Sequence, residues 1–251
     1  MITNIFESHA HFDDERYDLD RDELISSLKE KGIDAVVNIG ADMKGSRATM
    51  EYVDKYDFVY GAVGVHPEYA NDVDYTALRE FSRHPKIVAI GEIGLDYHYD
   101  GYNRDEQITA FKKQLELAKE VDLPVIIHSR DATQDTLDIL KEYKPRGVVH
   151  CFSGSAETAL EIEKLGMYIG FTGVITFKNA HRAIEALKAV PIDKLLCETD
   201  CPYMAPEPHR GERNDPSLLC HIIEKMAEVK GVSPQEMADI TNKNARTLFG
   251  L

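Results

Sequence analysis

The sequence predicts an α/β protein that folds as a TIM (β/α)8 barrel, and three observations lead to this expectation. Short apolar segments alternate with helical patterns about eight times, which is the number of units that closes such a barrel. Several apolar segments lack the polar alternation of a half-exposed strand and are typical of parallel strands covered by helices. The length of 251 residues suits one barrel, so we expect a single domain over residues 1–251. An open doubly wound sheet remains an alternative, although such sheets typically have fewer strands.

Each element is predicted from its local pattern. Helices are expected where apolar residues recur at helical spacing, as at Phe111, Leu115 and Ala118, and strands where a short apolar run lies between two such segments. Gly32 and Pro124 mark helix ends. In chain order, the predicted strands cover residues 2–6, 35–39, 59–65, 87–90, 125–128, 147–150, 168–171 and 194–200. The predicted helices cover residues 20–31, 45–56, 74–83, 105–121, 132–143, 156–165, 180–189, 217–230 and 233–249.

The stretch over residues 86–98 delivers one carboxylate, Glu92, to the end of a strand that is expected to be buried on both faces. Gly91 and Gly94 flank Glu92 and Ile93, which predicts a backbone held close to a neighbouring segment. Taken alone, this strand would be interpreted as one that ends in a solvated Glu beside an ordinary turn. The other strands favour a functional carboxylate, because the same arrangement recurs in them.

Polar residues follow most of the predicted strands. They are His9, His11, His66, Glu92, His128, His150 and Asp200. Because the carboxyl ends of all strands in a barrel open on one face, where active sites lie, we expect these side chains to converge. A single His after a strand is usually a hydrogen-bonded loop residue. Five imidazoles and two carboxylates at strand ends instead favour a metal centre.

The chemistry of these residue types suits divalent transition metals. Neutral imidazoles and carboxylates hold such ions while leaving positions open for water. His9 and His11 point to the same side if extended geometry continues to them, so both can reach one ion. A central carboxylate can bridge two ions about 3.5–4 Å apart. Asp200 would then bind metal and accept a proton from a bound water whose pKa the metal lowers toward about 7.

The composition limits the classes of partner. Apolar residues at 43% and charged residues at 29% are typical of a globular chain with a sizeable core. A formal charge of −15 repels nucleic acid and anionic membranes at long range, so a polyanionic substrate needs a local positive site. Arg130, Arg210 and Arg213 are the candidates for phosphate contact. The alternative for each is a surface ion pair, which Arg130 would make with Asp131.

The sequence indicates a cytoplasmic protein. Its first residues lack a basic region followed by an apolar segment, and no apolar run approaches the ~20 residues of a membrane span. The four cysteines form no CxxC pair, so we expect reduced thiols. We also expect a monomer or a weak oligomer without a membrane partner.

Six motifs resemble those of one family, in order along the chain. They are His9-Ala-His11, Gly64-Val-His-Pro67, Gly91-Glu-Ile-Gly-Leu-Asp-Tyr97, Ile127-His-Ser-Arg-Asp131, His150-Cys-Phe-Ser-Gly154 and Glu198-Thr-Asp-Cys-Pro-Tyr203. Together they extend over the whole chain and resemble the TatD-type metal-dependent deoxyribonucleases. The resemblance implies an amidohydrolase-like TIM barrel that binds two divalent cations, such as Zn, Mg, Mn or Ni. It also implies a 3'-5' exonuclease that hydrolyses phosphodiesters at DNA ends, and we expect single strands as the substrate.

The resemblance further implies a role for each matching residue. The cations would be held by His9, His11 and Asp200 on one side and by His128 and His150 on the other, with Glu92 as the bridge. His66 would lie beside the cations and contact a phosphate or the leaving group. Asp200, Glu92 and His66 are thus the expected catalytic residues.

Two positions depart from the usual pattern of this family. Glu7 stands where Asp usually opens the first motif, and Asp215 stands where Glu is usual in the loop over residues 210–216. Both residues keep the charge and move it by one methylene. We therefore expect altered support around the site with every ligand retained.

Two alternatives remain open. One is an amidohydrolase or lactonase that acts on a small amide, lactone or phosphoester. Many such enzymes bridge their metals with a carbamylated Lys, but no predicted strand ends in Lys at a matching position. The other alternative is a non-catalytic metal-binding protein, and the complete set of potential ligands argues against it.

Overall fold

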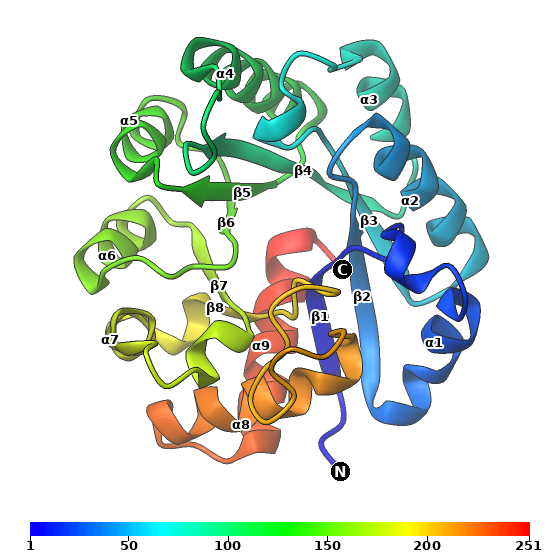
Figure 1. Ribbon diagram of the computed structural model, residues 1–251, viewed down its shortest axis with the longest axis vertical. Helices are drawn as coiled ribbons and strands as arrows, with labels where there is room; N and C mark the ends of the chain where they lie inside the picture. The colour runs from blue at the N-terminus through cyan, green and yellow to red at the C-terminus, as the bar shows by residue number, and fades with distance from the viewer.

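The computed structural model describes residues 1–251 and contains one sheet of eight parallel strands, ordered from β1 (Ile5–Ala10) to β8 (Leu195–Cys197). The last strand returns to the first, because Ala10 bridges Cys201 and the amide of Asp200 donates a hydrogen bond to the carbonyl of His9. Helices alternate with the strands and lie around the outside of the sheet (Figure 1). The predicted TIM barrel is therefore confirmed.

The remaining elements follow the predicted order. The strands are β2 (Ile33–Ile39), β3 (Val59–Val63), β4 (Ile87–Asp96), β5 (Val125–Arg130), β6 (Gly147–Val149) and β7 (Tyr168–Phe171). The helices are α1 (Arg21–Ser27), α2 (Met43–Lys55), α3 (Tyr75–Phe81), α4 (Arg104–Val121), α5 (Thr133–Tyr143), α6 (Ala156–Lys164), α7 (His181–Ala189), α8 (Leu219–Lys230) and α9 (Pro234–Phe249). None of the helices combines the length and the apolar composition that a membrane span requires.

The first predicted helix differs from the observed one. It is divided into α1 and a 3-10 turn, η2 (Lys29–Lys31), because the hydrogen bonding tightens at Leu28, whose amide donates to the carbonyl of Ile25. Gly32 ends the segment as predicted, and its φ of 88° is in the left-handed region that Gly adopts without a steric penalty.

Three strands differ from the prediction by three or more residues at one end. β1 begins three residues later than expected and runs through His9, β4 runs past Glu92, and β8 ends before Asp200. Every residue of β1 and β4 is buried, including the polar ones. An apolar pattern cannot mark a polar segment that is buried inside a barrel, so the prediction stopped too early in both strands.

An apolar floor supports the polar end of the barrel. A cluster of side chains from most of the strands packs against the end of α9, where Phe6 stacks on Phe249 with ring centroids 6.0 Å apart. A larger apolar cluster fills the space between strands and helices. The polar side chains lie further along the strands, toward their carboxyl ends, and are therefore mounted on a closely packed base.

Candidate metal centre

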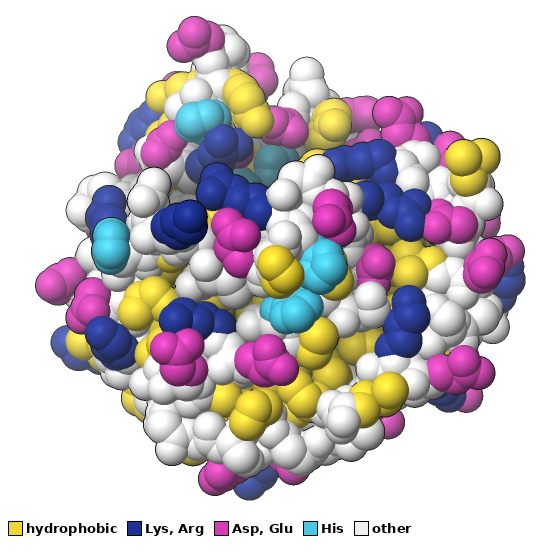
Figure 2. Space-filling model, turned by 60° about the horizontal axis from the view of Figure 1, so that its bottom comes forward, with side chains coloured by type: hydrophobic (Ala, Val, Ile, Leu, Met, Phe, Trp, Pro, Cys, Tyr) yellow, Lys and Arg dark blue, Asp and Glu magenta, His cyan; other side chains and the backbone are white.

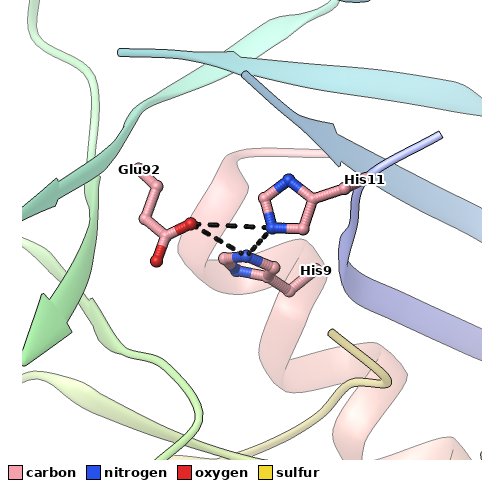
Figure 3. Close-up of side chains that lie close together, drawn as sticks. All are labelled: His9, His11 and Glu92. Carbon is pink, nitrogen blue, oxygen red and sulfur yellow. Dashed lines mark hydrogen bonds and ion pairs between the residues drawn. The ribbon is translucent and has the colours of Figure 1, made fainter. Parts of the chain in front are cut away.

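The structure brings the predicted site residues together at the carboxyl ends of the strands. They are His9 in β1, His11 directly after it, His66 after β3, Glu92 in β4, His128 in β5, His150 after β6 and Asp200 after β8. Five of them are buried, and His66 and His128 are half-buried. Figure 3 shows His9, His11 and Glu92 pointing toward one another. One cluster is thus assembled from segments that are far apart in the sequence.

Glu92 presents a different oxygen to each of two imidazole pairs. Its Oε2 lies 3.5 Å from Nε2 of His9 and 3.6 Å from Nε2 of His11. Its Oε1 lies 3.0 Å from Nδ1 of His128 and 2.6 Å from Nε2 of His150. The sequence placed Glu92 at the end of its strand, whereas it lies inside β4 and reaches into the barrel. Each imidazole pair therefore faces an oxygen of its own on a shared carboxylate.

Asp200 adds a second carboxylate to the first imidazole pair. Its Oδ1 lies 3.7 Å from Nε2 of His9 and 3.5 Å from Nε2 of His11. The backbone of Asp200 has a φ of 56°, which is uncommon for a residue other than Gly and is a conformation found at functional sites. The hydrogen bond from its amide to the carbonyl of His9 holds Asp200 beside β1.

Hydrogen bonds determine which ring nitrogen faces the centre. Nδ1 of His11 lies 3.0 Å from the carbonyl oxygen of Ile39, which can only accept, so Nδ1 carries the proton and Nε2 is a free ligand atom. Nε2 of His128 lies 3.0 Å from Oδ2 of Asp96, so Nδ1 of His128 faces inward. A metal-ligating His is typically anchored in this way through its second nitrogen.

The first imidazole pair needs a positive charge between its nitrogens. Nε2 of His9 and Nε2 of His11 lie 3.1 Å apart, where two lone pairs repel each other. Burial lowers the pKa of His9 to about 4. Burial also opposes a charge on His11, but the hydrogen bond to Asp200 and the charge of Glu92 outweigh it and raise the pKa of His11 to about 9. A proton therefore lies here in the metal-free protein, and a divalent cation suits the same position.

The two carboxylates of the centre are ionised at neutral pH. Burial disfavours the charge of Glu92, but His150 and His128 outweigh burial and hold the pKa of Glu92 well below its usual range. The pKa of Asp200 is also lowered, because its hydrogen bond to His11 outweighs burial. Anionic oxygens and imidazole nitrogens together fit the ligand set of a divalent transition metal.

His66 lies beside this cluster in the orientation of a hydrogen-bond donor. Its Nδ1 accepts a hydrogen bond of 3.2 Å from the amide of Glu68, so the proton is on Nε2, which lies 3.9 Å from Oε1 of Glu92. Burial lowers the pKa of His66 to about 3, and the ring is therefore neutral. His66, Asp96 and His128 lie close enough to share an ion. Because both nitrogens of His66 are engaged or protonated, we favour a donor over a ligand.

Two supporting carboxylates were missed by the sequence analysis. Asp96 anchors His128, as described above. Glu198 lies behind His150, with Oε1 3.8 Å from Nδ1 of the ring, and accepts a hydrogen bond of 2.6 Å from the amide of Cys151. Both carboxylates belong to motifs that also contain a site residue, which was the only signal for them in the sequence.

Glu7 and Asp215, the two residues that depart from the family pattern, both accept hydrogen bonds from backbone amides. Glu7 is fully buried and accepts hydrogen bonds from the amide of His9 at 3.0 Å and from the hydroxyl of Thr199 at 2.6 Å. Burial raises the pKa of Glu7 to about 8. Asp215 accepts a hydrogen bond of 2.8 Å from the amide of Ser217 and caps the 3-10 helix η6 (Pro216–Leu218). Glu7 thus ties β1 to the segment that leads to Asp200.

Of the three predicted arginines, Arg213 is paired with a carboxylate and Arg210 is not. Arg213 makes two hydrogen bonds, of 2.7 Å and 2.6 Å, to the carboxylate of Asp20. The guanidinium of Arg210 lies 4.4 Å from the ring centroid of Phe177 and has no carboxylate partner. The surface ion pair considered as the alternative is therefore present at Arg213.

The environment of Arg130 differs from the predicted alternative. The expected partner, Asp131, instead lies 2.8 Å from Nδ1 of His98. Arg130 forms no ion pair and donates a hydrogen bond of 3.2 Å to the hydroxyl of Tyr99. The ion pair of Arg130 with Asp131, which was the alternative to phosphate contact, is therefore not formed, and the charge of Arg130 is not neutralised by a carboxylate.

The fold and the cluster together define a class of protein. TIM barrels place their active sites at the carboxyl ends of the strands. A buried set of imidazoles and ionised carboxylates at this position is suited to hold divalent cations, which can activate water for hydrolysis. The protein is therefore a metal-dependent hydrolase.

Comparison with known proteins narrows the class to a family. The sequence profile of the family described as TatD related DNase matches residues 6–250. The chain is 46% identical over 251 residues to the uncharacterized metal-dependent hydrolase YabD of Bacillus subtilis, and the match covers 98% of each chain. It is 36% identical over 261 residues to the 3'-5' ssDNA/RNA exonuclease TatD of a Rahnella species, again covering 98% of each. The crystal structure of YJJV, a TatD homologue from Escherichia coli, superposes with a TM-score of 0.92 over all of both chains at 30% identity. The chain belongs to the TatD family of metal-dependent hydrolases.

Proposed function

We propose that this chain is a 3'-5' exonuclease that cleaves phosphodiester bonds at the ends of single-stranded DNA with two divalent cations. The proposal rests on the carboxylate of Glu92, each oxygen of which faces a separate imidazole pair. Paired cations that share a ligand are typical of phosphatases, nucleases and polymerases. The name of the Rahnella relative supports both the direction of cleavage and the type of strand.

The residues of the chain divide the work of hydrolysis. One cation would be held by His9, His11 and Asp200 and the other by His128 and His150, with Glu92 shared. When bound, these cations (Zn, Mg, Mn or Ni) would lower the pKa of water and neutralise phosphate charge. Asp200 is ionised and can accept the proton that the attacking water loses. The Nε2–H group of His66 can donate a hydrogen bond to the phosphate or to the leaving oxygen.

The charge of the molecule favours an end of a single strand over a long duplex. On the face shown in Figure 2, Lys and Arg side chains occur in small groups among Asp and Glu side chains. With a formal charge of −15, the surface cannot hold an extended phosphate backbone. Attraction must then come from the centre itself and from an arginine beside it without a carboxylate partner, which is Arg130, two residues beyond His128 in β5. Binding through so few phosphates predicts a shallow salt dependence, with log K falling by roughly 0.7 per contact on single strands.

The experiment compares four substrates in parallel under identical metal conditions. They are a linear single-stranded oligonucleotide, a closed circle of the same sequence, a dipeptide and a lactone. We expect shortening of the linear strand from its 3' end and no reaction of the others. Asp200→Asn protein purified in the same way is the control for contaminating nuclease.

Each other outcome contradicts a defined part of the proposal. Cleavage of the circle would exclude an end-directed enzyme. Turnover of the dipeptide or the lactone with the DNA intact would show that the protein is an amidohydrolase or lactonase and not a nuclease. A metal-loaded protein that leaves all four substrates intact would support the non-catalytic alternative.

A further inference from the structure

Two exposed tyrosines with an arginine over each ring lie at the carboxyl ends of the strands. Tyr203 follows β8, and the guanidinium of Arg16 lies 4.2 Å from its ring centroid. Tyr99 follows β4, and the guanidinium of Arg130 lies 5.1 Å from its ring centroid. The exposed fractions are 45% for Tyr203 and 55% for Tyr99. Large aromatic rings exposed beside an active site are a common feature of ligand-binding surfaces.

The Tyr203 pair borders the metal centre and carries little net charge. The ring of Tyr203 lies 6.3 Å from that of His11, which faces the centre. Asp14 accepts two hydrogen bonds of 2.9 Å from the guanidinium of Arg16 and one of 3.0 Å from the hydroxyl of Tyr203. Both side chains are thus held in place, and the charge of Arg16 is matched by that of Asp14. The pair offers a fixed flat surface.

The Tyr99 pair borders the other half of the centre and has a free charge. Arg130 lies two residues beyond His128, at the end of β5, and its guanidinium donates to the hydroxyl of Tyr99. No carboxylate pairs with Arg130, because Asp131 is engaged with His98. This pair therefore combines an exposed ring with a cation that can contact a phosphate.

The two pairs lie on opposite sides of the barrel mouth. In a barrel with strands ordered from β1 to β8, the boundary between β4 and β5 is half a turn away from the boundary between β8 and β1. Tyr99 and Arg130 follow the first two strands, whereas Tyr203 and Arg16 follow the last and the first. The cluster around Glu92 lies between them. A strand that crosses the centre from the β4–β5 side to the β8–β1 side therefore passes both pairs.

We propose that the Tyr99–Arg130 and Tyr203–Arg16 pairs stack the bases of an unpaired nucleic-acid strand on the two sides of the phosphate that is cut. This inference rests on the proposed function and adds the surface that holds the substrate. Stacking accepts any base and contributes most of the binding that an acidic surface cannot supply through phosphates. It also requires unpaired bases, which explains why a single strand would be preferred to a duplex.

The test measures binding of a single-stranded oligonucleotide whose terminal linkages are phosphorothioates that resist cleavage. Mn²⁺-loaded protein is titrated and followed by fluorescence anisotropy. Tyr99→Leu and Tyr203→Leu should each weaken binding by about 5-fold or more, whereas Tyr99→Phe and Tyr203→Phe should stay within about 2-fold of the original. The matched control is Tyr168→Leu, because Tyr168 begins β7 at the other end of the barrel and has the ammonium of Lys194 4.7 Å from its ring centroid. This control should not change the affinity.

A second arm separates stacking from support of the metal centre. An oligonucleotide with abasic positions next to its end should bind the original protein about 5-fold or more weakly, and the Tyr→Leu variants should show no further loss. The chain has no Trp, so Tyr203→Trp introduces a single Trp, which can be excited apart from the tyrosines and whose fluorescence a stacked base should quench. The metal content of Tyr203→Leu should equal that of the original protein.

The outcomes distinguish the two proposals. If the original protein binds and shortens DNA but the Tyr→Leu variants bind equally well, stacking is excluded and the exonuclease remains. A fall in the metal content of Tyr203→Leu would instead assign Tyr203 to the metal centre and overturn its stacking role. If the original protein neither binds the phosphorothioate oligonucleotide nor shortens an unmodified one of the same sequence, both proposals are wrong.

Discussion

Glu92 is the residue on which the proposed chemistry depends. Its side chain is buried and ionised, and imidazoles approach both of its oxygens. In the metal-free protein, protons on His11 and His128 balance the charges of Glu92 and Asp200. Two cations would replace these protons and would repel each other without a carboxylate between them. Loss of the Glu92 charge should therefore act first on metal binding.

Replacement of Glu92 and of Asp200 should abolish turnover by different routes. Glu92→Gln should lose at least one cation per chain and lower kcat more than about 100-fold. Asp200→Asn should lose a similar amount of rate while keeping more metal, because Glu92 still faces both imidazole pairs. Elemental analysis and turnover measured on the same samples test this. Unchanged metal content in Glu92→Gln would exclude the bridging role.

The pKa values of His11 and His128 predict how pH affects the metal-free protein. Burial opposes the charge of His128, but Asp96 and Glu92 raise its pKa to about 9, as Asp200 and Glu92 do for His11. Both values exceed the ~6.5 of an unfolded chain, so these protons stabilise the fold fully below pH 6.5, and the stabilisation is lost as the pH rises through about 9. The Tm of the metal-stripped protein should therefore fall between pH 6.5 and 9.

Metal affinity should change in the opposite direction over the same range. A cation must displace the protons of His11 and His128, so its apparent affinity should rise as the pH approaches 9. Calorimetric titration at several pH values, together with Tm scans of stripped and loaded protein, measures both effects. An affinity that is constant between pH 7 and 9 would show that no proton is displaced.

His66 should contribute to rate without contributing to metal binding. His66→Leu removes the Nε2–H donor and should lower kcat by about 100-fold or more with the metal content unchanged. His66→Gln keeps a donor of similar reach and should recover part of the rate. Loss of a cation in either variant would show that His66 is a ligand, in the group that it forms with Asp96 and His128.

Single residues differ in how far the sequence could predict them. The imidazoles and carboxylates after strands were predictable, because parallel strands in a barrel bring their carboxyl ends to one face. The roles of Asp96 and Glu198 were not predictable, because each depends on which imidazole of a neighbouring strand lies beside the carboxylate. The ion pair of Arg213 joins it to Asp20, 193 positions away in the chain, and no local pattern indicates such a contact.

At the scale of the elements, the backbones of β4 and β5 come very close together at Gly94, where a residue with a Cβ would not fit. A Cβ at Gly94 would overlap the carbonyl oxygen of His128, and the φ of Gly94 is 146°. The prediction that Gly94 holds the backbone close to another segment is confirmed. His128, whose backbone lies against Gly94, also faces Oε1 of Glu92 with its side chain. The distance between β4 and β5 therefore sets the geometry of the centre.

Gly94→Ala should therefore damage both stability and metal binding. The clash and the unfavourable φ together should lower the free energy of unfolding by about 2 kcal/mol or more, and the displaced His128 should reduce metal content. The matched control is Gly101→Ala, which has a φ of 87° but no atom within 4 Å of the added Cβ, and should cost only about 1 kcal/mol. Denaturant unfolding measures both variants, and equal effects would show that close approach is unimportant.

The helices were predicted better than the strands. Each helix after the first matches its predicted range to within two residues at either end. These helices have one apolar face and one solvent-exposed polar face, and this pattern marks a helix in the sequence. The strands that carry the ligands were placed less well, since their side chains are polar yet buried in the barrel. The segments that bear the chemistry are thus the ones that depart from the local pattern.

At the scale of the whole molecule, closure of the barrel creates the centre. His9 and Asp200 lie near opposite ends of the chain and meet because β8 returns to β1. The number of alternating segments predicted this closure, and with it the convergence of the imidazoles and carboxylates at the ends of the strands. Distances within the cluster, the supporting carboxylates and the surface around the mouth depend on tertiary packing, which one sequence does not contain.

The proposed two-cation exonuclease is tested most directly by measuring bound cations and DNA cleavage in the same samples. Metal-stripped protein is titrated with Mn²⁺ while shortening of an end-labelled single-stranded oligonucleotide is followed. We expect activity to appear as the second equivalent binds, with products that shorten stepwise from the 3' end. Full activity with one cation would contradict the two-cation mechanism. Binding of two cations with the oligonucleotide left intact would contradict the exonuclease.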